Sequence, residues 1–227
     1  MTAAELDIVL LSLKVAFWAM LGTLPVALVL AFWLARREFP GKALVDGVIN
    51  LPLVLPPVVT GYLLLLTFGR NGAIGAFLEQ HLGITFAFRW SGAALAAAVM
   101  GLPLAVRAMR QAIEAIDRRL EDAAATLGAS PPWILLTVSL PLAVPGILNG
   151  LLLSFARSLG EFGATITFVS SIPGETQTLP LAIYNFTQVP GGDSAAWRLC
   201  VLSIALSLGA LVLSEWLARA ARHRVHA

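Results

Sequence analysis

Long apolar runs recur along the chain, and they constrain its fold more than any other feature. A helix needs about 20 mostly apolar residues to cross the hydrocarbon core of a bilayer. Only 12% of the 227 residues are charged, roughly half of the share that is usual in a soluble domain. The sequence therefore predicts an all-α integral membrane protein, a single domain over residues 1–227, with about five transmembrane helices over residues 8–35, 48–68, 90–109, 146–169 and 197–217.

The fourth apolar run extends from residue 133 to 172 and is too long for a single membrane span, so we expect it to form two helices. Pro141 and Pro145 lie in this stretch, and prolines break or begin helices. We therefore expect a short interfacial helix over residues 130–140, followed by a separate membrane helix over residues 146–169.

The second run contains several residues that weaken a helix, namely Pro52, Pro56, Pro57 and Gly61. Each proline removes a backbone hydrogen bond, and such positions commonly bend a membrane helix. The pattern predicts a bend, which is a candidate hinge but equally compatible with a fixed kink.

Lysine and arginine are divided unequally between the two sides of the predicted spans. Positive residues accumulate on the cytoplasmic side of a membrane. Five spans then place the N-terminus outside and the C-terminus inside, since ten of these residues lie on one side and three on the other: Arg36, Arg37, Lys42, Arg107, Arg110, Arg118, Arg119, Arg219, Arg222 and Arg224 against Arg70, Arg89 and Arg198.

The loop over about residues 110–140 is thereby predicted to be cytoplasmic. Apolar residues recur at helical spacing from 109 to 127, with charged residues on the opposite face, which indicates an amphipathic helix. Asp117 is suited to cap a helical turn, Gly128 to end a helix, and Ser130 before Pro131 to begin the next one. We expect a helix, a tight turn and a second helix.

This amphipathic helix has two possible roles. It could lie in the headgroup layer with its arginines on anionic lipid. It could instead dock a cytosolic partner, which the small side chains of residues 123–125 favour, because they allow close approach of another protein.

The same loop carries a recognisable motif. Its residues match in register the pattern Glu-Ala-Ala, three residues, Gly, nine residues, Ile, one residue, Leu-Pro, at Asp122, Ala123, Ala124, Gly128, Val138, Leu140 and Pro141. The loop therefore resembles the cytoplasmic loop of permease subunits of ATP-binding-cassette importers. Asp122 replaces Glu and is one methylene shorter, with Glu121 adjacent, and Val138 replaces Ile.

Two longer segments, residues 51–75 and 157–184, resemble the permeases of molybdate importers. The string Gly-Glu-Phe-Gly-Ala over residues 160–164 is also similar to sulfate and thiosulfate permeases. The resemblance covers nearly the whole chain, and it implies a type I importer permease fold with a cytoplasmic coupling helix. It also implies a multi-pass location in a bacterial cytoplasmic (inner) membrane.

The resemblance further implies transport of molybdate, with sulfate, thiosulfate or tungstate as the alternative. The implied partners are a second copy of the chain, two cytoplasmic ATPase subunits, a periplasmic molybdate-binding protein and the lipid bilayer, and no nucleic acid. No phosphate-binding loop occurs in the sequence, so we expect ATP and magnesium on the ATPase subunits and no cofactor on this chain. The outer loop over residues 170–180 is expected to face the binding protein.

Arg157 and Glu161 stand four residues apart in the fourth predicted span. Ionisable groups at membrane depth are costly, so we expect them to face the interior, either as a buried structural pair or on the translocation pathway. Ser158 and Thr165 add hydroxyls that could line the same pathway or bond to their own helix. An intramembrane enzyme would need a nucleophile with its base, paired carboxylates or a metal cluster, and the scattered histidines predict no metal site.

Overall fold

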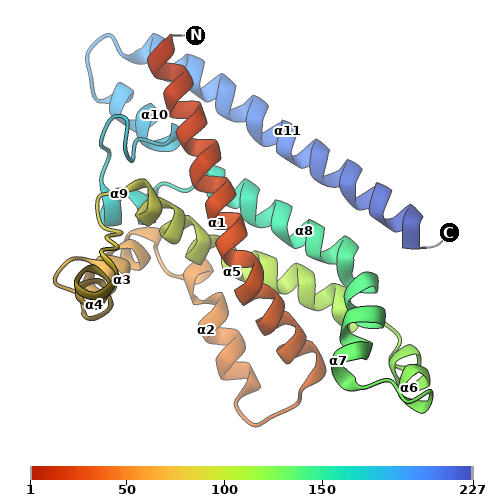
Figure 1. Ribbon diagram of the computed structural model, residues 1–227. Helices are drawn as coiled ribbons and strands as arrows, with labels where there is room; N and C mark the ends of the chain where they lie inside the picture. The colour runs from red at the N-terminus through yellow and green to blue at the C-terminus, as the bar shows by residue number, and fades with distance from the viewer. Residues whose placement is uncertain (1, 226–227) are drawn as a thin grey trace.

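The computed structural model describes the backbone of residues 2–225, which forms a helical bundle (Figure 1). Side chains are described except at residues 214, 215 and 217–225, where the arginines counted at 219, 222 and 224 lie. The elements in chain order are α1 (Ala3–Arg36), α2 (Lys42–Val54), α3 (Pro57–Phe68), α4 (Ala73–Leu82), α5 (Trp90–Glu114), α6 (Arg118–Thr126), α7 (Pro131–Ile134), the π-helical turn η1 (Leu135–Ser139), α8 (Leu140–Leu159), α9 (Gly163–Val169), α10 (Leu179–Thr187) and α11 (Asp193–Val225).

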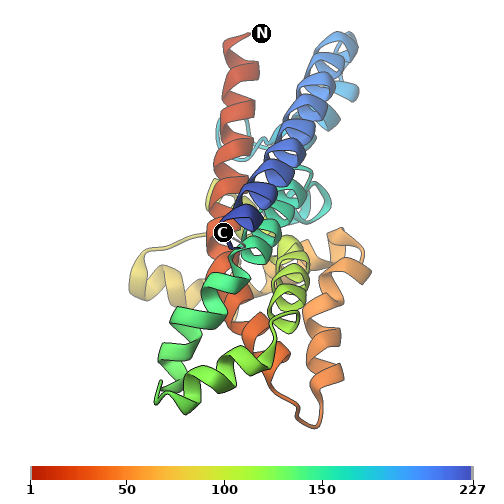
Figure 2. The same ribbon diagram turned by 90° about the vertical axis from the view of Figure 1, so that its right-hand side faces the viewer.

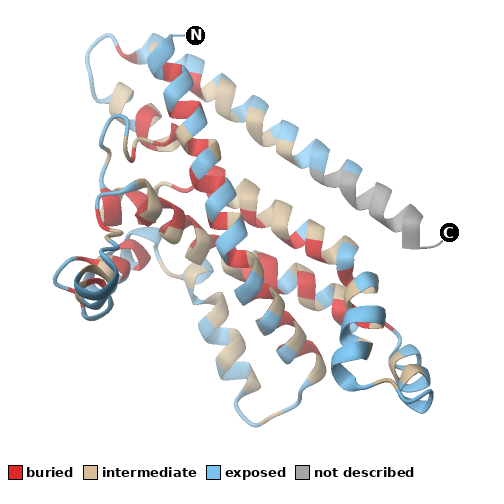
Figure 3. Cartoon of the chain, in the orientation of Figure 1, coloured by how far each residue is buried: buried red, intermediate tan, exposed pale blue. Residues whose placement is uncertain are grey.

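The centre of the bundle is formed by α1, α5 and α8, which pack on one another along much of their length. Figure 3 shows the buried residues gathered where these helices meet. The contact surfaces are rich in alanine, and Ala27, Ala31 and Ala105 are fully buried. A Cβ atom on Gly150 of α8 would lie 3.0 Å from the carbonyl oxygen of Ala105. Small residues therefore let these backbones approach closely, as is usual between membrane helices.

Four helices among the described residues are long and apolar enough to span a bilayer: α1, α5, the continuous helix of residues 131–159, and α11. The pair α2 and α3 would supply a fifth span as a bent unit. Figures 1 and 2 place the N-terminus and the start of α11 at one end of the molecule, and α6 with the α1–α2 turn at the other. The prediction of an all-helical membrane protein with about five spans is confirmed, counting the bent pair as one span.

The second predicted span is sharply bent. Its two helices, α2 and α3, meet at an angle of 109°. Pro56 is the N-cap residue of α3 and Pro57 its first residue, where a missing amide hydrogen costs nothing. Pro52 lies inside α2 and does not interrupt it. The sequence correctly predicted a bend, and a hinge motion at this bend stays a prediction.

The predicted division at Pro141 and Pro145 is wrong, because α7, η1 and α8 form one continuous helix over residues 131–159. In an α-helix the ring of Pro141 would collide with the carbonyl group four residues earlier, at Thr137. Thr137 lies in the π-helical turn, where the amide of Leu140 donates to the carbonyl of Leu135, five residues earlier. The wider turn directly before Pro141 allows the helix to continue.

The predicted end of the fourth span at Val169 is also wrong. The helix ends at Leu159, and residues 160–162 separate it from the short helix α9. Arg157 therefore lies in the last turn of α8, whereas Glu161 lies in the break between α8 and α9. The two residues were expected one turn apart on a single helix, and this expectation is corrected.

Candidate functional site

The α6 hairpin, residues 117–134, projects from one end of the bundle (Figures 1 and 2). Its local geometry matches the predictions from sequence. The Asp117 side chain accepts a hydrogen bond from the amide of Arg119 at 3.0 Å, so it caps α6. Gly128 has φ of 87°, the left-handed conformation that glycine adopts readily, and Ser130 is the N-cap residue before Pro131.

Every residue of α6 is exposed or half-buried, and Figure 3 shows the hairpin mostly in the exposed colour. Leu127 at its end is 88% exposed and Trp133 is 60% exposed. An open groove of about 600 Å³ runs between them, lined also by Ala124, Gly128 and Thr137. Exposed large apolar side chains beside an open groove are a feature of sites where another protein binds.

The seven motif residues divide into two groups in the structure. Asp122, Ala123, Ala124 and Gly128 lie on the exposed hairpin. The other three, Val138, Leu140 and Pro141, lie where η1 joins α8, and Leu140 packs against the buried cluster between α1, α5 and α8. The first group is therefore available to a partner, and the second joins the hairpin to the core.

Ionic contacts surround the base of the hairpin, and the sequence patterns did not reveal them. Glu121 pairs with Arg36 of α1 at 2.6 Å. Arg110 of α5 contacts Asp46 of α2 at 2.8 Å. At the start of α2, the ammonium group of Lys42 donates to the carboxylate of Glu38 at 2.7 Å and lowers the pKa of that carboxyl. The pairs to Arg36 and Arg110 link residues far apart in the chain, for which local spacing carries no signal.

The second candidate site is the break between α8 and α9. Glu161 is 3% exposed, and its Oε1 accepts a hydrogen bond from the amide of Ala164 at 2.9 Å, in the first turn of α9. Its Oε2 lies 2.7 Å from Nη1 of Arg157. This second contact is an ion pair without hydrogen-bond alignment. The carboxylate thus orders the start of α9 and neutralises Arg157.

The hydroxyl groups predicted for the pathway are occupied by backbone carbonyls. Ser158 donates to the carbonyl of Ser154 at 2.8 Å, and Thr165 donates to the carbonyl of Phe162 at 2.9 Å. Both side chains are buried. Arg157, whose side chain is 28% exposed, is the member of this predicted set with access from outside the protein.

Gly61 lies in a close contact between α3 and α9. A Cβ atom added to it would lie 2.9 Å from Cα of Ala164 and would also meet the carbonyl oxygen of that residue. Across the same contact, a Cβ atom on Gly163 would lie 2.7 Å from Cβ of Pro57. The absence of a side chain at Gly61 is thus explained by packing of α3 on α9.

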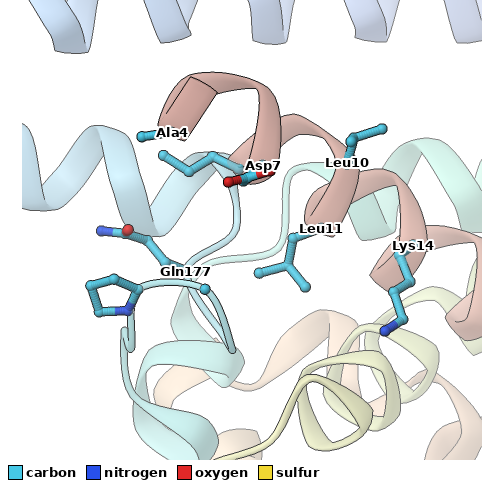
Figure 4. Close-up of a pocket in the computed structure, with 9 residues that line it drawn as sticks. Ala4, Asp7, Leu10, Leu11, Lys14 and Gln177 are labelled. Carbon is cyan, nitrogen blue, oxygen red and sulfur yellow. The ribbon is translucent and has the colours of Figure 1, made fainter. Parts of the chain in front are cut away.

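The opposite end of the molecule carries a pocket of about 390 Å³ between the start of α1 and the loop before α10 (Figure 4). Asp7 and Lys14 of α1 line it together with Gln177 of the loop. The ammonium group of Lys14 lies 3.8 Å from the ring centre of Trp90, a cation–π contact. Across the described part of the chain, no group of three or more His, Cys, Asp or Glu side chains is placed to hold a metal ion.

Comparison with known proteins identifies the architecture. Residues 24–223 match the family model described as binding-protein-dependent transport system inner membrane component. The chain has a TM-score of 0.74 to a solved bacterial transporter that imports alginate, at 16% sequence identity, covering 96% of this chain and 80% of that one. At this identity the structural match supports the fold alone.

Relatives with higher identity extend over nearly the full chain. The molybdenum transport system permease protein ModB of Escherichia coli K12 is 59% identical, covering 99% of this chain and 98% of the relative. ModB of Haemophilus influenzae is 58% identical, covering 95% of this chain and 94% of the relative. The sulfate transport system permease protein CysW of Synechococcus elongatus is 41% identical over 86% of this chain and 68% of its own length.

Proposed function

The chain belongs to the family of binding-protein-dependent transport system inner membrane components, and we propose that it is the permease subunit of an ATP-driven molybdate importer. It is a multi-pass membrane protein of the inner membrane. The observation that carries the proposal is an exposed, alanine-rich α6 hairpin in a chain similar over its full length to molybdenum permeases. The chain is a transport subunit and acts with an ATPase made by other subunits.

In this proposal two ATPase subunits bind the α6 hairpins of two copies of the chain. ATP and magnesium are held by those subunits, and hydrolysis moves the hairpins. A periplasmic molybdate-binding protein delivers the anion at the opposite end, near the loop over residues 170–180 and the start of α1. The N-terminus then lies outside and the C-terminus in the cytoplasm, as the unequal distribution of Lys and Arg favours.

Arg157 is the residue that we propose contributes to the anion pathway. An unpaired arginine in a low-dielectric pathway would hold a dianion too tightly for release. Glu161 at 2.7 Å reduces its net charge and leaves a weak attraction. Ser158 and Thr165 then act on the backbone of the same region, because their hydroxyls already donate to carbonyl groups.

Sulfate, thiosulfate or tungstate is the alternative substrate, since these oxyanions share the shape and charge of molybdate. The 41% identity to a sulfate permease gives this alternative some support, but the 59% and 58% identities to molybdenum permeases favour molybdate.

A reconstituted transporter tests the assignment. The chain is co-expressed with its ATPase subunit, purified, and placed in vesicles with the binding protein. We expect the ATPase subunit to co-purify, and ATP hydrolysis to rise with molybdate more than with sulfate at equal concentration. Stimulation by sulfate but not by molybdate would favour the alternative substrate. Failure to retain an ATPase subunit would contradict the permease assignment.

A further inference from the structure

Glu121 joins the exposed helix α6 to the rest of the molecule. Its Oε1 accepts one hydrogen bond from Nη2 of Arg36, at the end of α1, and another from Oγ of Ser139, in η1, both at 2.6 Å. Among the described side chains of α6, Glu121 is the one with a hydrogen bond or ion pair to another helix. Hydrogen bonds to an ionised group are roughly twice as strong as neutral ones.

Apolar packing under α6 is incomplete, which gives this bridge more weight. A groove of about 290 Å³ lies between the helix and the body, and Phe32, Ala125 and Leu135 line it. The side chains of Arg36 and Glu121 are each 20% exposed, so water does not surround the pair. A displacement of α6 therefore reaches the body through these two hydrogen bonds as well as through the chain itself.

We propose that Glu121 is a positioning residue that transmits movement of α6 to two helices at once. Through Arg36 it engages α1, whose 34 residues span about 50 Å and reach the pocket beside Asp7 and Lys14 at the opposite end. Through Ser139 it engages the π-helical turn, which continues into α8 and ends near Arg157. The inference rests on the proposed function, because it assumes that an ATPase displaces α6.

Asp122 contrasts with its neighbour. Asp122 is exposed, and it occupies the motif position at which the permeases that this loop resembles have Glu. The structure thus gives the two adjacent carboxylates different tasks. Asp122 is available to an incoming subunit, whereas Glu121 is engaged inside the chain.

The test measures molybdate uptake and ATP hydrolysis in the same vesicles, and it compares the uptake per ATP of each variant with wild type. Glu121→Gln and Arg36→Gln each remove one charge of the bridge. We expect the ATPase subunit to stay bound and hydrolysis to continue, while uptake per ATP falls about three- to tenfold in both variants. The exchange Arg36→Glu with Glu121→Arg restores opposite charges and should recover about half or more of the loss.

Glu38→Gln is the matched control, because Glu38 is also a carboxylate paired with a basic residue at this end, but its hydrogen bond and ion pair are with Lys42 of α2. Its uptake per ATP should equal that of wild type. If the permease with Glu121→Gln does not fold, Ser139→Ala removes a single hydroxyl of the bridge and should lower the same ratio by a smaller factor.

Wild-type uptake per ATP in both Glu121→Gln and Arg36→Gln, or in Ser139→Ala where the Glu121→Gln permease does not fold, would overturn the inference. Loss of the ATPase subunit from a folded Glu121→Gln complex would also overturn it, since Glu121 would then act at the subunit contact. Failure of the wild-type complex to couple molybdate to hydrolysis would instead refute the proposed function, independently of any variant.

Discussion

Glu121 and Glu161 both hold a helix in position, but they do so in opposite surroundings. Glu121 lies at the edge of the molecule, 20% exposed, and its partners come from helices distant in the sequence. Glu161 is 2% exposed in its side chain, and its partners lie within four residues. A local pair with a buried carboxylate fixes the shape of one segment, whereas a partly exposed long-range bridge can transmit movement between segments.

The largest effect on stability is expected from removing the partner of the buried carboxylate of Glu161. Arg157→Ala leaves the carboxylate of Glu161 buried with no opposite charge, which should lower the free energy of unfolding by about 3 kcal/mol. Glu161→Gln should be much milder, because its amide oxygen can still accept from Ala164. Thermal unfolding of the purified complexes compares the two variants. Equal and small losses would contradict a stabilising role of the ion pair.

The same variants separate structure from transport. We expect Glu161→Gln to assemble with the ATPase and to show lower coupled uptake, because Arg157 then attracts the anion without compensation. Uptake at the wild-type rate in this variant would refute a role of the pair in the pathway.

The next largest effect is expected at the contact of α3 with α9, which supports the Glu161 region. Gly61→Ala places a Cβ atom against the backbone of Ala164 and should cost about 1–3 kcal/mol. Gly22→Ala in α1 is the control, because a Cβ atom there meets nothing within 4 Å. The measurement is thermal unfolding, and equal melting temperatures for the two variants would contradict the close contact.

At the α6 hairpin the expected effect is on binding. Leu127→Ser changes a residue that is 88% exposed, so the free energy of unfolding should change by less than about 0.5 kcal/mol. Affinity for the ATPase subunit should fall about tenfold if Leu127 anchors that contact. Titration of the purified ATPase subunit onto the permease measures it. An unchanged affinity would exclude the groove of Leu127 and Trp133 from the contact.

The smallest effect is expected at Glu38, an exposed carboxylate that pairs with Lys42. The pKa of Glu38 is lowered by its hydrogen bond to Lys42, so the pair stabilises the folded state above the ordinary carboxyl pKa of 4.5. This contribution is lost as the pH falls through the lowered folded-state value. The melting difference between wild type and Glu38→Gln should therefore shrink between pH 7 and about pH 4. A difference that grows with acidification would contradict the sign.

The two regions also differ in how far the sequence predicts them. The α6 hairpin follows from local signals, since Asp117, Gly128 and Ser130 each act on the backbone next to them. The contact of Glu121 with Arg36 does not follow from local signals, because the two residues lie 85 positions apart and helical spacing carries no information over that distance. The bridge becomes visible only once α1, α6 and η1 are placed together.

In the fourth span, the general tendency of proline to break a helix gave the wrong helix boundary. Pro141 was expected to break the helix, but the π-helical turn before it removes the clash that the rule assumes. The break lies instead at residues 160–162, where Gly160 and Gly163 flank Glu161. Two glycines around a charged residue were an available signal for a helix end, and the apolar run on both sides concealed it.

The proposed function requires the α6 hairpin to lie on the cytoplasmic side, and cysteine labelling in intact cells measures this directly. Ala125→Cys is introduced in a Cys200→Ser background, which removes the cysteine of the native sequence. Gln188→Cys, in the exposed turn before α11, is the control on the opposite side. A maleimide that does not cross membranes should label the Gln188→Cys variant in intact cells, and the Ala125→Cys variant only after lysis. Labelling of the Ala125→Cys variant in intact cells would contradict the account.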